Sequence, residues 1–194
     1  MSQTGDLTAS TVATGSQPVA VNRYVTFFSL AGFGCALDLL SKYWVFAWLS
    51  KHPHGHVHWL WPEYFGLQIS LNEGALFGIG QGQVWLFATL AFGAVGGILY
   101  WMFVLGAARD AWLTLAMGFV MAGVLGNLYD RLGLWTPPWR PDDRIHAVRD
   151  WILWQYGDWQ WPNFNIADSF LVCGAIMLVW HALRYPSPPP AAIR

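Results

Sequence analysis

Two aspartates in the second half of the chain, Asp150 and Asp168, have the surroundings expected of acid–base groups. Asp150 lies among large apolar side chains, and Asp168 opens an apolar band, where helix N-terminal amides favour a negative charge. If two carboxylates approach closely, their repulsion raises one pKa and the pair holds one proton near neutral pH. One group then serves as general base on a water molecule while the other protonates a carbonyl. Spacing alone leaves this approach open, and a helix-start charge explains Asp168 equally well.

Charged and amide side chains also occur within the apolar bands, where charge is costly. Asp38 and Lys42 are four residues apart and share one helix face, so they form either a self-neutralised pair or the lining of a polar site. Asn127, Asp130 and Arg131 fall within one turn at the end of another band. An adjacent acid and base at a helix end favours a structural ion pair, with direct function as the alternative.

Histidine and cysteine give no clear metal set. Four histidines alternate with other residues over His52–His58, but Pro53 and Gly55 disfavour a regular strand. We expect an interfacial loop there, with adventitious metal binding as the alternative. Cys35 and Cys173 lie in separate apolar runs, which predicts small buried hydrophobic side chains instead of a disulfide or a zinc site.

The composition places this chemistry in a membrane. Of the 194 residues, 55 % are hydrophobic and 11 % are charged, whereas soluble domains carry about 25 % charged residues. The ten Lys and Arg are spread along the chain and the net charge is −1, which excludes a basic nucleic-acid-binding stripe.

Four apolar bands are long enough to cross a bilayer as helices. They cover about residues 24–49, 84–105, 111–129 and 166–183. Four crossings put both chain ends and the short connection 106–110 on one face, and the long connections 50–83 and 130–165 on the other. Alternation of apolar and polar residues over Leu67–Asn72 predicts a half-buried strand in the first long connection. Basic residues are similarly frequent on both faces, so charge leaves the orientation open.

Several runs occur in the order of a known set of signature blocks. They are Leu37–Lys42 (LDLLSK), Leu71–Gly78 (LNEGALFG), Ala122–Arg131 (AGVLGNLYDR), Val148–Ile152 (VRDWI) and Phe164–Ser169 (FNIADS). Together they resemble the lipoprotein signal peptidases, signal peptidase II, from Asp38 to about Leu183. The combination of FNIADS with GN-x-x-DR is far more specific than either block alone.

This resemblance implies roles for individual residues. Asp150 and Asp168 match the catalytic aspartates of the family. Matches to supporting positions that shape the substrate pocket are Asp38, Lys42, Asn72, Gly74, Asn127, Asp130, Arg131, Asn165 and Ala167. Among these, we expect Asn72 and Arg131 to contact the substrate backbone.

The resemblance also implies a mainly α membrane protein with four transmembrane helices, a small membrane-lying β-cradle and a periplasmic loop or helix. It implies the bacterial inner membrane, cytoplasmic termini and an active site near the periplasmic face. Residues 23–185 would form the peptidase domain, with cytoplasmic tails at 1–22 and 186–194. The expected substrate is a prolipoprotein, cut before its diacylglyceryl-modified cysteine. We expect no cofactor or metal, and a monomer whose partners are this substrate and membrane lipid.

Three departures from the family pattern affect the site. Trp151 follows the first aspartate in place of the usual Phe, which keeps an aromatic wall, and Leu76 is larger than the usual Ala. An insertion over Thr136–Asp143 adds Asp142 and Asp143 as rival acids, although their proline-rich, charged setting indicates a solvated loop. The two alternative functions are a small transporter or ion-conducting protein that uses the intramembrane acids, and a structural assembly subunit.

Overall fold

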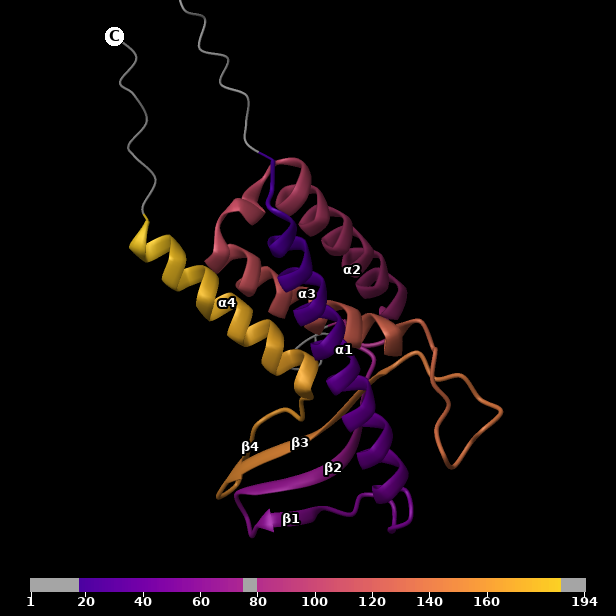
Figure 1. The fold of residues 1–194 in the computed structure, drawn as a ribbon. Helices are drawn as coiled ribbons and strands as arrows, with labels where there is room; N and C mark the ends of the chain where they lie inside the picture. Colours follow the sequence, from indigo (N-terminus) through magenta and orange to yellow (C-terminus); the bar gives the residue numbers. More distant parts are fainter. Residues whose placement is uncertain (1–17, 75–79, 186–194) are drawn as a thin grey trace, which may run out of the picture.

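Four long helices and one small antiparallel sheet make up the fold, seen in a computed structural model that describes residues 18–74 and 80–185 (Figure 1). The helices are α1 (Val21–Leu49), α2 (Val84–Leu99, continued by a π-helical turn over Tyr100–Val104), α3 (Ala111–Arg131) and α4 (Ile166–Arg184). Each is long and apolar enough to cross a membrane. The prediction of four spanning helices is therefore confirmed, with bounds that differ by three residues or fewer from those expected.

Helix α3 is the central helix and packs between α1 and α4. Its buried positions recur through its whole length, whereas most residues of the other helices are half-buried or exposed. Gly126 lets the helices approach closely: a Cβ atom there would meet the carboxylate of Asp38 on α1 and the Cβ of Ala167 on α4. Small residues of this kind permit close helix contact in membranes.

The sheet has the strand order β1-β2-β3-β4, all antiparallel. The strands are β1 (His58–Trp61), β2 (Phe65–Asn72), β3 (Val148–Tyr156) and β4 (Trp159–Gln160). β2 covers the predicted strand. β3 and β4 are joined by a two-residue turn in which Gly157 has a φ of 58°, a backbone conformation that glycine adopts without a steric penalty. In the pairing of β2 with β3, Ser70 lies opposite Asp150.

The sheet lies at one end of the helix bundle (Figure 1). Figure 1 also shows that α1 begins, α4 ends and α2 connects to α3 at the opposite end. Asp110 caps α3 there, accepting hydrogen bonds from the backbone amides of Trp112 (2.7 Å) and Leu113 (3.0 Å). Since the start of α1, the end of α4 and the connection from α2 to α3 all lie opposite the sheet, both long connections lie on one face of the bundle, as predicted.

Between α3 and β3 the chain forms an irregular loop over residues 132–147. The resemblance allowed a loop or a helix at this face, and it is a loop. Pro137, Pro138 and Pro141 explain this outcome, because proline lacks the amide hydrogen that a helix interior requires. Leu76 and most of the two predicted tails (1–17 and 186–194) lie outside the described residues.

Candidate active site

Asp150 enters the site from the middle of the sheet. β3 alternates its side chains between two faces, so Val148, Asp150 and Trp154 line one cavity while Arg149 and Trp151 do not. Trp151 was expected to form an aromatic wall of the site. That expectation is wrong, because the period of the strand directs Trp151 away from the cavity that Asp150 lines.

Asp168 enters from the first turn of α4. Asn165 is the N-cap of this helix: its side-chain oxygen accepts a hydrogen bond from the backbone amide of Asp168 (3.0 Å). In return, the Asp168 carboxylate accepts a hydrogen bond from the backbone amide of Asn165 (3.2 Å). This reciprocal capping box holds the carboxylate at the helix start.

Two asparagines connect the acids. The amide nitrogen of Asn165 donates to Asp150 at 2.6 Å and to the side-chain oxygen of Asn127 at 3.1 Å. The amide nitrogen of Asn127 donates to Asp168 at 2.8 Å. Because Asn165 is fully buried and Asn127 is nearly so, this chain of hydrogen bonds fixes both carboxyl groups in one frame.

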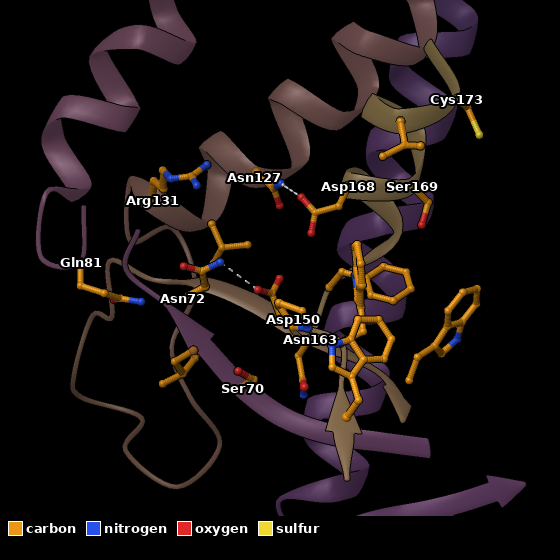
Figure 2. Close-up of a pocket in the computed structure, with 18 residues that line it drawn as sticks. Ser70, Asn72, Gln81, Asn127, Arg131, Asp150, Asn163, Asp168, Ser169 and Cys173 are labelled. Carbon is orange, nitrogen blue, oxygen red and sulfur yellow. Dashed lines mark hydrogen bonds between the residues drawn. The ribbon is translucent and has the colours of Figure 1, made fainter. Parts of the chain in front are cut away.

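Both acids line one cavity of about 820 Å³, and Figure 2 shows their carboxyl groups directed into it. Burial, and then repulsion from Asp168, raise the pKa of Asp150 from 3.8 to about 7. Hydrogen bonds from Asn72 and Asn165 and the charge of Lys42 act in the opposite direction. A carboxyl pair that holds one proton near neutral pH fits this geometry.

The rest of the cavity is largely apolar. Aromatic side chains from β3 and from the segment before α4 line it, together with two residues on the outward side of α4: Trp154, Trp159, Trp161, Phe164, Val172 and Cys173. No pattern in the sequence indicated that these tryptophans line the site. Alternation along β3 from Asp150 could have identified Trp154.

Asn72 and Arg131 line the same cavity from the other side (Figure 2). Asn72 donates to Asp150 at 3.1 Å, and its side-chain oxygen accepts from the Gly74 amide at 3.0 Å. Arg131 donates to the Gly74 carbonyl at 3.1 Å, and its guanidinium lies 5.6 Å from the ring centroid of Phe87. The Nε atom of Arg131 is buried without a hydrogen-bond partner in the described structure.

A buried network of charges supports the acids from α1 and α3. Lys42 pairs with Asp38 (2.7 Å) and Asp130 (3.1 Å) and donates to Asn127 (3.0 Å). Asp38 also accepts the Ala167 backbone amide at 2.9 Å, so it ties α1 to the start of α4. Of the two alternatives for Asp38 and Lys42, the internally neutralised pair is the one observed, because neither side chain lines the cavity. Lys42 acts on the site through its hydrogen bond to Asn127.

Arg149 is a member of this network that sequence reasoning missed. It forms the buried ion pair with Asp130, at 2.7 Å, that we had considered for the adjacent Arg131. Arg131 instead faces the cavity. The sequence position of Arg149 could have indicated this pair. An arginine that directly precedes a buried aspartate in an apolar strand needs an acidic partner to offset its own charge.

The two rival acids lie apart from this site. Asp142 and Asp143 are exposed in the loop 132–147, as the sequence indicated. Within residues 18–74 and 80–185, no group of three or more His, Cys, Asp or Glu side chains is arranged to hold a metal ion. Both cysteines are free thiols: Cys35 is half-buried, and Cys173 is exposed and lines the cavity, so the prediction of a buried side chain is wrong for Cys173.

Comparison with known proteins identifies the family. A family model described as signal peptidase (SPase) II matches residues 30–184. The chain belongs to the signal peptidase II family. A lipoprotein signal peptidase of Rhodopirellula baltica is 50 % identical over 179 residues, which cover 91 % of this chain and 80 % of that protein. A lipoprotein signal peptidase of Rhodococcus jostii is 36 % identical over 163 residues, which cover 84 % of this chain and 75 % of that protein.

Two solved structures, both described as a bacterial membrane enzyme, share this fold. One has a TM-score of 0.70 at 24 % identity, over 88 % of this chain and 94 % of its own. The other has a TM-score of 0.66 at 26 % identity, and the match covers 82 % of this chain and 94 % of that structure's chain. Membership of the signal peptidase II family confirms the predicted peptidase activity and favours it over a transporter or a structural subunit.

Proposed function

We propose that this signal peptidase II removes signal peptides from diacylglyceryl-modified prolipoproteins, with Asp150 and Asp168 as its catalytic pair. The observation that carries the proposal is the placement of both carboxyl groups on one cavity, joined through Asn165 and Asn127. No other acid of the described residues lines that cavity.

The two aspartates divide the acid–base work. Asp150, with its raised pKa, holds the proton, and Asp168 is the carboxylate that removes a proton from water. As the water oxygen attacks the scissile carbonyl carbon, Asp150 donates its proton to the carbonyl oxygen. The tetrahedral intermediate then collapses, the C–N bond breaks, and the proton taken up by Asp168 passes to the leaving nitrogen. One water is consumed, and Asp150 is reprotonated when the intermediate reforms a carbonyl.

The polar side of the cavity suits an extended peptide. Arg131 already donates to a backbone carbonyl, that of Gly74, and Asn72 presents an amide beside Asp150. Both groups can hydrogen-bond a substrate backbone next to the acids. Asn127 and Asn165 fix the carboxyl groups, while Asp38, Lys42, Asp130, Gly74 and Ala167 shape the frame around them.

The apolar side suits the lipid and the signal helix. Trp154, Phe164 and Val172 form a wall that continues from the acids toward the outward side of α4. Acyl chains on the substrate cysteine can remain in the bilayer beside this wall while the bond before the cysteine reaches the acids. We therefore assign membrane lipid and the lipidated precursor as partners of a monomeric enzyme.

We propose that the sheet end of the bundle, which carries the site, faces the periplasm and that both termini face the cytoplasm. The family resemblance supports this orientation, because it implies an active site near the periplasmic face of the bacterial inner membrane. Labelling with a membrane-impermeant thiol reagent tests this in cells, in a chain with Cys35 and Cys173 replaced by Ala. Asp158→Cys in the β3–β4 turn should react in intact cells, and Arg109→Cys only after permeabilisation. The reverse pattern would refute the orientation.

The activity is tested with purified protein and a lipidated precursor. Mass spectrometry should show a single cut immediately before the modified cysteine. The same precursor with that cysteine replaced by Ser carries no lipid and should be cut at a rate lower by about 10²-fold, because it lacks the acyl contacts that place the bond. Equal cleavage of both precursors, or cleavage elsewhere, would contradict the substrate assignment.

A further inference from the structure

Arg149 is joined to Asp130 at three points in the buried charge network. Its Nε and Nη2 atoms donate to Asp130 Oδ1 at 3.0 and 2.7 Å, and its backbone amide donates to Asp130 Oδ2 at 3.0 Å. Asp130 is fully buried and Arg149 is 4 % exposed. Three hydrogen bonds therefore fix β3 to the end of α3 at the residue directly before Asp150.

The last turns of α3 also bind Asp168, the other acid of the site. Asn127 and Asp130 are three residues apart and lie on one helix face. Asn127 binds the Asp168 carboxylate, and Asp130 binds Arg149. The distance between the two acids therefore depends on how β3 and α4 are each fixed to α3.

The Arg149 guanidinium also lies over the ring of Trp135, 4.8 Å from the ring centroid. Trp135 is 7 % exposed and packs edge-on against Phe46 of α1, with ring centroids 5.8 Å apart. Arg149 is thus held between a carboxylate and an aromatic ring, a geometry that suits a planar guanidinium and not an ammonium group. Through Trp135 it also links the loop 132–147 to the strand that carries Asp150.

We propose that Arg149 is a positioning residue, whose bonds to Asp130 and contact with Trp135 hold β3 on α3 and so keep the Asp150 carboxyl group in register with Asp168. The proposal rests on the proposed function, because it takes Asp150 as a catalytic group. The competing explanation is charge balance alone: Asp38 and Asp130 are matched by Lys42 and Arg149, and any arrangement that keeps the network neutral would serve.

Kinetics on the lipidated precursor separate the two explanations. In Arg149→Met, kcat should fall by about 10²-fold with KM within about threefold, since a shift of about 1 Å in a reacting group has an effect of this size. Arg149→Lys keeps the charge but loses the planar fork, and its kcat should fall by about tenfold. Arg140→Met is the matched control: Arg140 is exposed in the loop 132–147, and its removal should leave kcat unchanged.

The double variant Asp130→Asn/Arg149→Met decides the question. It removes one charge of each sign, so the buried network is neutral again, and at most the main-chain bond of the original three remains. We expect the melting temperature lost in Arg149→Met to be largely recovered while kcat stays low by at least about tenfold. Recovery of kcat to within about threefold of wild type, or wild-type kcat in Arg149→Met, would overturn the proposal.

Two further measurements distinguish loss of folding, loss of the Arg149 role and failure of the proposed function. If Arg149→Met does not fold, Arg149→Lys and the double variant give the same decision. Asp150→Asn is assayed in parallel: an inactive Asp150→Asn with a fully active Arg149→Met leaves the proposed function standing and removes only the role of Arg149. Full activity in Asp150→Asn would instead remove the proposed function itself.

Discussion

Asp150 is the more deeply buried of the two acids that line the cavity. It is 2 % exposed, and its two oxygens accept from Asn165 and Asn72. Burial and Asp168 raise the pKa of Asp150 to about 7, while these hydrogen bonds lower it. The mechanism needs the proton on Asp150, so activity should fall as the pH rises through the folded-state pKa.

The position of that alkaline limb can be moved. Asn72→Ala removes a donor that stabilises the charged form of Asp150, so the pKa of Asp150 should rise further. A hydrogen bond to a charged group is worth about 1.5–3 kcal/mol, which predicts an upward shift of the limb by roughly one to two pH units. The measurement is the pH profile of kcat/KM.

Gln68→Ala is the control for Asn72→Ala, because Gln68 lies on the same strand and bonds Asn163 instead of Asp150. Its alkaline limb should coincide with that of the wild type. A limb that stays in place or moves to lower pH in Asn72→Ala would show that Asn72 does not act on the protonation of Asp150.

Asn165 has two roles that substitutions can separate. Asn165→Ser keeps a good N-cap for α4 but is too short to reach Asp150, so the melting temperature should be nearly unchanged while kcat falls by about 10²-fold. Asn165→Ala should lose the same activity and, in addition, about 1 kcal/mol of unfolding free energy. Wild-type kcat in Asn165→Ser would mean that Asn165 is only a helix cap.

At the scale of elements, the glycines of α3 set the distances between helices. Gly126→Ala would place a methyl group against Asp38 and Ala167, which we expect to lower the free energy of unfolding by about 1–3 kcal/mol. Activity should fall as well, because Asp38 positions the start of α4. Thermal melting in detergent and precursor cleavage measure the two effects.

Gly93→Ala on α2 is the matched control, since among the described residues no atom beyond the adjoining backbone of α2 itself lies within 4 Å of a Cβ built at Gly93. Its stability should equal or exceed that of the wild type, because alanine favours helix. Equal loss in both variants would show that a glycine requirement of the helix backbone, and not the packing of α3 against α1 and α4, explains the effect at Gly126.

The elements differ in how far the sequence could predict them. The helices follow from hydropathy and length, and β2 follows from the alternation over Leu67–Asn72. Pairing of β2 with β3 joins segments about 80 residues apart, and no local pattern encodes the register that places Ser70 opposite Asp150. The signature blocks named both acids, but the partners of Arg131 and Arg149 depend on this pairing and on the end of α3, so they could not be predicted.

At the scale of the whole molecule, the few buried charged side chains of the helix bundle lie together at one of its ends. Asp38, Lys42, Asp130 and Arg149 are buried near the sheet end and sum to zero charge. This neutral network contacts the site through Lys42, which donates to Asn127, and Asn127 in turn donates to Asp168. The chain thus keeps its buried charges paired and leaves the Asp150–Asp168 pair facing the cavity.

The central claim is that this pair carries out the hydrolysis. The most direct measurement is cleavage of the lipidated precursor by purified Asp150→Asn and Asp168→Asn, with Asp142→Asn as control and melting curves to show that each variant is folded. We predict that both site variants are folded and lose cleavage by at least about 10³-fold, while Asp142→Asn retains wild-type activity. Substantial cleavage by either folded site variant would contradict the account.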